Sequence, residues 1–156
     1  MDASPPPDPK QYAADLRLNQ IIWIALVTGV ALMTAVMGGL TVSGSVPTVT
    51  DNAAVYFYLA AGFSIVALIV AFSVQRRMID RLPTKGTSQE VAGAVRTAGI
   101  ISLAVLEAAA FVACIATLLT GELINLLFVV PFFGFALVFF PTAARFESLL
   151  HMARRR

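Results

Sequence analysis

The stretch TAGIISLAVLEAAAFVACIATLL, residues 97–119, decides the fold of this chain. It is long, almost wholly apolar, and interrupted by one charged side chain, Glu107. An α-helix needs about 20 predominantly apolar residues to cross the hydrocarbon core of a bilayer. The stretch is therefore predicted to be a membrane-spanning helix with a carboxyl group near its middle.

The composition of the whole chain supports this prediction. Of its 156 residues, 58% are hydrophobic and 13% are charged, and the mean hydropathy is +0.83. A soluble domain is about a quarter charged. The chain is expected to be an all-α integral membrane protein. Its one cysteine, Cys114, cannot form an internal disulfide and is interpreted as a buried packing residue.

Four stretches are apolar enough to cross a bilayer: residues 20–42, 53–74, 97–119 and 123–140. The first is too long for the core of a cleavable signal peptide, which has about 7–15 apolar residues. The fourth is the shortest and contains Pro131. The connection between the third and fourth stretches is very short, so these helices must be antiparallel neighbours. We expect a four-helix antiparallel bundle over residues 20–140.

The basic residues define an orientation. All 11 Lys and Arg residues fall within residues 1–19, 75–96 and 141–156. None lies in the loop that joins the first two predicted spans or in the loop that joins the last two. Positive residues resist translocation across the membrane, so the pattern predicts that both termini are cytoplasmic (N-in/C-in). Trp23 is expected at the inner membrane boundary. With no organelle signal in the sequence, the bacterial inner (plasma) membrane is the default location.

The flanking segments are predicted to be cytoplasmic. Residues 1–19 begin with the proline-rich MDASPPPDPKQY and are expected to be a disordered tail. The second helix is predicted to continue to about Arg81, and the third to start near residue 88. Residues 141–156, PTAARFESLLHMARRR, combine apolar and basic side chains and are expected to form a short amphipathic helix on the membrane surface.

Two ridges of small residues are spaced four apart along the predicted helices. Such ridges let helix backbones approach closely. They are Ala31, Ala35 and Gly39 on the first helix, and Ala109, Ala113 and Thr117 on the third. Packing within the bundle accounts for both ridges, and self-association is the alternative.

Glu107 is the residue that indicates a functional role, because placing an acidic group at the bilayer centre costs a few kcal/mol. No Lys or Arg lies at its depth in any predicted span, which excludes an internal salt bridge. Three interpretations remain open. The carboxyl could be protonated and hydrogen-bonded to Thr34, Ser64 or Asn125, where it would serve only to hold neighbouring helices together. It could exchange a proton or cation, or it could pair with a charged residue of a partner subunit.

Residues 96–119, RTAGIISLAVLEAAAFVACIATLL, resemble the carboxylate-bearing second helix of the rotor c subunit of ATP synthases. The resemblance implies that Glu107 carries the translocated ion. The rest of the chain departs from that family. The helix before it lacks the glycine repeat, the loop QRRMIDRLPTKGTS replaces a short polar motif, and two further helices flank the hairpin.

Motifs of enzyme chemistry are missing from the sequence: there is no HExxH, CxxC, phosphate-binding loop or G-x-S-x-G. We expect no enzymatic activity, no catalytic or metal residues and no cofactor, and the scattered basic residues disfavour nucleic-acid binding. The sequence predicts a small multi-pass membrane protein, acting as an accessory or structural subunit. Its expected partners are the lipid bilayer and other membrane subunits or further copies of itself. The alternative function is proton or cation translocation through Glu107.

Overall fold

The computed structural model describes residues 9–48, 52–81, 88–145 and 147–149. All regular elements in these ranges are helical. They are α1 (Pro9–Val42), α2 (Ala53–Asp80), α3 (Ser88–Thr120), the 3₁₀-helix η1 (Leu123–Val129) and α4 (Val130–Val138).

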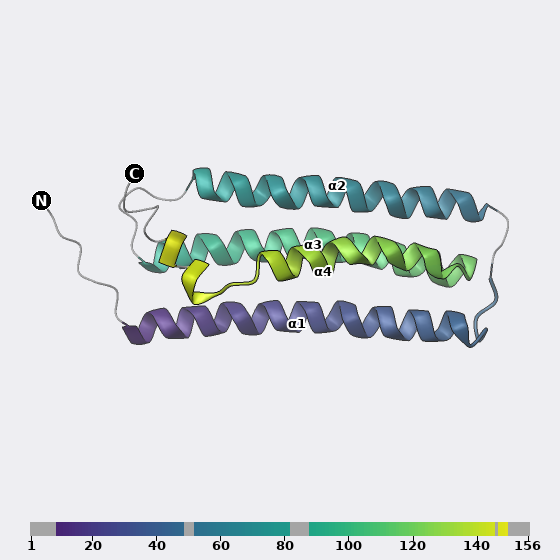
Figure 1. The fold of residues 1–156 in the computed structure, drawn as a ribbon, viewed down its shortest axis with the longest axis horizontal. Coiled ribbons are helices and arrows are strands. Elements are labelled where there is room, and N and C mark those ends of the chain that lie inside the picture. Colours follow the sequence, from purple (N-terminus) through teal and green to yellow (C-terminus); the bar gives the residue numbers. More distant parts are fainter. Residues whose placement is uncertain (1–8, 49–51, 82–87, 146, 150–156) are drawn as a thin grey trace, which may run out of the picture.

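The long helices lie side by side, and consecutive helices run in opposite directions (Figure 1). α1 and α2 flank a central pair formed by α3 and α4, so α1 and α3 run in the same direction. α3 packs against both α1 and α2 along their length and also contacts η1 and α4. An all-α fold was predicted, and the described residues form an all-helical bundle.

α3 is the core helix because its small side chains allow neighbours to approach from several sides. Half of its most apolar window is buried, against 11% for α1 and 22% for α2. Its side chains Leu103, Leu106, Ala110 and Cys114 are almost completely inaccessible. Cys114 is a buried free thiol, as expected for a packing residue.

Aromatic side chains join α2 to η1 and α4. Phe57 meets Phe128 edge-to-face at 5.1 Å between ring centroids, and Phe72 meets Phe135 at 5.5 Å. Edge-to-face pairs of this kind stabilise by about 0.5–1.5 kcal/mol beyond the area they bury. The phenylalanines of residues 123–140 therefore fix the fourth segment against the second helix.

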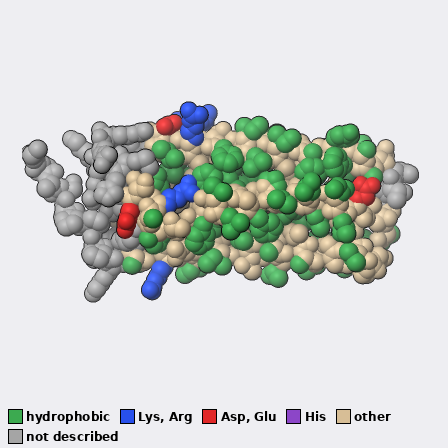
Figure 2. Space-filling model, in the orientation of Figure 1, with side chains coloured by type: hydrophobic (Ala, Val, Ile, Leu, Met, Phe, Trp, Pro, Cys, Tyr) green, Lys and Arg blue, Asp and Glu red, His purple; other side chains and the backbone are tan. Residues whose placement is uncertain are grey.

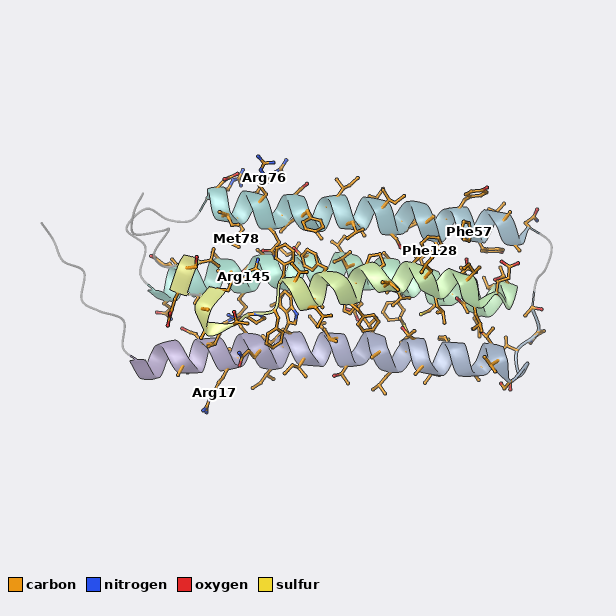
Figure 3. The ribbon with its side chains drawn as sticks, in the orientation of Figure 1. Arg17, Phe57, Arg76, Met78, Phe128 and Arg145 are labelled. Carbon is orange, nitrogen blue, oxygen red and sulfur yellow. The ribbon has the colours of Figure 1, made fainter. Side chains whose placement is uncertain are left out.

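The described arginines gather where α1 and α3 begin and α2 and α4 end. We call this the arginine-rich end and the other the opposite end. Figure 2 shows the blue side chains at this end of the molecule, with apolar atoms covering the middle of the visible face. Figure 3 places Arg17, Arg76 and Arg145 at the same end. Within the described ranges, three helices are long and apolar enough to cross a membrane.

The fourth predicted span differs from the expectation of one helix over residues 123–140. Leu123–Val129 is 3₁₀-helical and only Val130–Val138 is α-helical, with Pro131 in the first turn. Proline is tolerated in the first turn of an α-helix. A 3₁₀-helix rises about 2.0 Å per residue against 1.5 Å in an α-helix. The tighter coil thus lengthens a short segment to about 28 Å, close to a bilayer core of about 30 Å.

The predicted disordered tail over residues 1–19 is wrong for its second half, because α1 already begins at Pro9. Asp15 and Asn19 then both bond to Arg96 of α3, which holds the extended helix against its neighbour. Residues 1–8 lie outside the described part of the chain.

The segment after α4 turns by 71° into a short helical stretch, Ala143–Leu149. Leu149 is buried in a small cluster with Val91 and Ala92 of α3. At Leu149 the apolar side of the segment therefore packs on protein. The prediction was instead that this side would contact the lipid of the membrane surface. Residues 150–156 lie outside the described part. If this bent pair of helices counts as one span, the described part of the chain has up to four helices that could cross a membrane, by length and composition.

Candidate functional site

Glu107 lies in the middle of α3, at the boundary between its buried and exposed faces. Leu103, Ala110 and Cys114 on one side are buried, while Phe111 on the other is 46% exposed. The carboxyl itself is half-buried and forms no hydrogen bond or ion pair with the described residues. The carboxylate predicted at the centre of the third span is thus unpartnered within this part of the chain.

The three side chains expected to bond to Glu107 are engaged elsewhere. Thr34 Oγ1 donates to the Val30 carbonyl at 2.8 Å, and Ser64 Oγ donates to the Phe128 carbonyl at 3.1 Å. Asn125 Nδ2 donates to Thr120 Oγ1 at 3.1 Å. The structure therefore does not bring these residues together with Glu107, because each finds a local or helix-crossing acceptor.

The two ridges of small residues face different surroundings. Ala109, Ala113 and Thr117 are buried, so the ridge on α3 packs within the bundle. Ala31, Ala35 and Gly39 are exposed on α1, and a Cβ atom added at Gly39 would meet nothing within 4 Å. Among the described residues, the α3 ridge is packed inside the bundle and the α1 ridge is not.

A cavity of about 30 Å³ lies at the arginine-rich end, where α1, α2 and α3 meet the segment after α4. Its wall is mostly apolar, and its polar side chains are Asn19, Gln75, Arg96 and Arg145. No Asp or Glu is among its lining residues. No sequence motif marks this site, since its residues are scattered from α1 to the C-terminal segment.

Arg96 is neutralised and held in place by α1. Its Nη2 atom donates to Asp15 Oδ1 at 3.0 Å, and its Nε atom donates to Asn19 Oδ1 at 2.8 Å. Arginine has only donors, so the contact with Nε identifies the oxygen of the Asn19 amide. The other amide atom, Nδ2, is buried without a hydrogen-bond partner.

Arg145 reaches the same cavity from the C-terminal segment. Its Nη1 atom donates to the Val138 carbonyl at 2.7 Å, and its guanidinium lies 4.4 Å from the centre of the Phe139 ring. The Val138 contact satisfies a free carbonyl at the end of α4. Both partners are neutral, and burial lowers the pKa of the guanidinium because desolvation disfavours its charge.

Trp23 closes the inner side of the cavity. Its indole Nε1 donates to the Ala136 carbonyl at 3.0 Å, and the ring is 7% exposed. Gly99 makes room for it, since a Cβ atom there would lie 2.7 Å from the Trp23 ring. Trp23 therefore lies at the arginine-rich end and packs inside the bundle; its expected depth at the inner membrane boundary stays a prediction.

No three His, Cys, Asp or Glu side chains come together among the residues described, so these residues offer no ligand set for a metal ion. Comparisons of the chain with protein-family models, curated proteins and solved structures found no match. The resemblance of residues 96–119 to the rotor c subunit thus stays a prediction, and functional inference rests on Glu107, the exposed ridge and the cavity.

Proposed function

We propose that this chain is a multi-pass membrane protein, N-in/C-in, that serves as an accessory or structural subunit and binds a partner within the bilayer. The observation that carries the proposal is the unpartnered carboxyl of Glu107 at the edge of the exposed face of α3. An uncompensated acid at membrane depth is costly and calls for a donor or cation from outside the chain. The bacterial inner membrane remains the proposed location.

The exposed ridge of α1 supports the same proposal. Ala31, Ala35 and Gly39 present small side chains outward rather than to α3. Close helix contacts in membranes depend on such residues, because packing and not hydrophobicity drives association there. A partner helix at this ridge would lie on the side of α1 that this chain leaves open.

The first test is mild extraction from native membranes, followed by native mass measurement and identification of co-purifying chains. We expect a second chain whose recovery falls in Glu107→Leu and in Ala35→Phe. Glu122→Gln and Ala25→Phe are the matched controls, since both positions are exposed and lie away from Glu107 and the ridge. A wild-type protein recovered as a lone monomer would overturn the proposal.

Orientation is tested separately with single cysteines. Cys114 is completely buried, so added thiols can be labelled without replacing it. Ser45→Cys, between α1 and α2, should react with a membrane-impermeant maleimide in intact cells, and Arg81→Cys should react only after lysis. The reverse pattern would contradict N-in/C-in.

The same unpartnered carboxyl favours translocation of protons or cations as the second candidate function. In that case dicyclohexylcarbodiimide should label Glu107 selectively, and Glu107→Gln should abolish transport without reducing assembly. A homo-oligomeric ring in the native mass measurement would favour this alternative. Absence of labelling in intact membranes would remove it.

A further inference from the structure

We propose that the cavity at the arginine-rich end binds the headgroup phosphate of an anionic phospholipid from the adjoining leaflet. The inference rests on the proposed function in one respect, namely insertion in a membrane. It does not depend on Glu107 or on any protein partner. Three features of the described residues carry it: a buried free donor, a cation with only neutral partners, and a wall that is apolar.

The free donor is Nδ2 of Asn19. Asn19 lines the cavity and is only 5% exposed, yet Nδ2 has no acceptor among the described residues. Leaving a buried donor unsatisfied is costly, so such groups in native structures call for an explanation. Because Arg96 fixes the amide oxygen, the amide cannot turn over to present an acceptor instead. An oxygen acceptor in the cavity would satisfy it.

The cation is Arg145. Its described contacts are a carbonyl and an aromatic ring, and no carboxylate lines the cavity. Arg96 differs because Asp15 already neutralises it. The cavity therefore keeps one uncompensated positive charge beside the free donor. A phosphate oxygen would meet both, and hydrogen bonds between ionised groups are about twice as strong as neutral ones.

The apolar wall and its position favour a lipid as the source of the phosphate. Ile22, Ile100 and Leu149 line the cavity, and Ile100 is 37% exposed on the outward face of α3. The arginine-rich end is the proposed cytoplasmic end, and basic pockets between helices on that side suit anionic headgroups. About 30 Å³ of space admits a few oxygen atoms rather than a bulky polar head. The small head of phosphatidic acid is therefore the best probe.

Trp23 offers a direct readout, because it is the single tryptophan of the chain and lines the cavity. The full-length protein, stripped of lipid in a neutral detergent, would be titrated with phosphatidic acid carrying brominated acyl chains, which quench indole fluorescence. We expect half-maximal quenching at about tenfold lower lipid concentration than with brominated phosphatidylcholine, since one charge-assisted contact is worth about that ratio. Equal quenching by the two lipids would overturn the proposal.

Variants assign the preference to the cavity. Arg145→Gln should remove most of the tenfold preference, and Arg145→Lys should keep part of it by keeping the charge. Arg17→Gln is the matched control, because Arg17 is an exposed arginine at the same end that does not line the cavity (Figure 3). Asn19→Ala should also weaken the preference. A preference that falls equally in Arg17→Gln and Arg145→Gln would show diffuse surface charge and overturn the assignment.

A competition arm separates the sources of phosphate. Inorganic phosphate should displace the brominated lipid only at concentrations far above those of the lipid, because it lacks acyl chains. Displacement at matched concentration would overturn the lipid as ligand. Circular dichroism checks that each variant is folded. If the cysteine labelling gives the proposed orientation while lipid preference is absent, only this inference fails; if the labelling itself fails, the proposed function fails.

Discussion

The arginine-rich end and the opposite end of the bundle each bury an asparagine with one unsatisfied atom, but in different surroundings. At the opposite end Asn125 donates from Nδ2 to both Thr120 Oγ1 and the Glu122 carbonyl, and only the acceptor Oδ1 lacks a partner. At the arginine-rich end Asn19 accepts from Arg96, and its donor lacks a partner beside a cavity.

At the opposite end the polar groups bond to one another within a turn. At the arginine-rich end a buried donor beside the cavity has no acceptor among the described residues. The opposite end is joined by a short connection in which Thr120 and Gly121 satisfy neighbouring backbone and side-chain groups. The arginine-rich end is built from residues far apart in the chain, with charge concentrated around a space. Ligand binding is therefore expected at the arginine-rich end rather than at the opposite end.

The largest effect is expected at Gly99, where Trp23 packs against the helix backbone. A Cβ atom at Gly99 would lie 2.7 Å from the Trp23 ring, so Gly99→Ala must displace the indole. We expect a loss of about 1–3 kcal/mol in the free energy of unfolding, as for other overpacked cores. Equilibrium unfolding in mixed micelles, followed by circular dichroism, measures it.

Gly93→Ala is the control, because Gly93 lies on the same helix with nothing within 4 Å of an added Cβ atom. Here the substitution should stabilise by about 0.5–1 kcal/mol, since alanine is the better helix former. Changes of the same sign at the two glycines would contradict the close approach of Trp23 to α3.

The next effect is expected at the opposite end, in Gly121→Ala. Gly121 has φ +73°, and an added Cβ atom would lie 2.9 Å from Thr48 Cγ2. The left-handed conformation alone costs a residue with a side chain about 1–2 kcal/mol. The same unfolding measurement should show at least this loss.

Thr48→Ser removes the Cγ2 methyl group that an added Cβ atom at Gly121 would contact. It therefore separates the cost of this contact from the cost of the left-handed backbone conformation. The double variant should recover the part due to the contact and keep the part due to the backbone. Full recovery would mean that the conformation of the turn adapts freely, and the opposite end would then be less rigid than its hydrogen bonds indicate.

A smaller effect is expected from Trp23→Phe, which keeps an aromatic ring but removes the bond to the Ala136 carbonyl. One hydrogen bond contributes about 0.5–1.5 kcal/mol to stability. Unfolding followed by circular dichroism should show a loss in that range. An unchanged midpoint would mean that the carbonyl finds another donor, so that Trp23 is held by packing alone.

The smallest effect is expected from Asp15→Asn, which breaks the ion pair with Arg96. The two side chains are 24% and 28% exposed, and pairs this accessible are worth about 0.2–1 kcal/mol. The loss should shrink as salt is raised from low to physiological concentration. Losses that are large and independent of salt would mean that Asp15 shapes the cavity rather than only neutralising Arg96.

Several features followed from the sequence by local rules. The first three apolar stretches each lie within one long helix, with α2 ending at Asp80 and α3 beginning at Ser88 close to the expected positions. The distribution of arginines predicted one basic end, which the described arginines form (Figure 3). Residue type and spacing along the chain are sufficient for each of these features.

Only the tertiary structure decided which side of each helix meets protein. Membrane helices are apolar on every face, so periodicity does not separate a lipid-facing side from a protein-facing side. For this reason the sequence did not distinguish the ridges of α1 and α3. Thr34, Ser64 and Asn125, which were possible partners of Glu107, are likewise engaged elsewhere. The cavity is also decided by the tertiary structure, because it exists only where α1 meets the segment after α4. There Asn19 and Arg145 line one space.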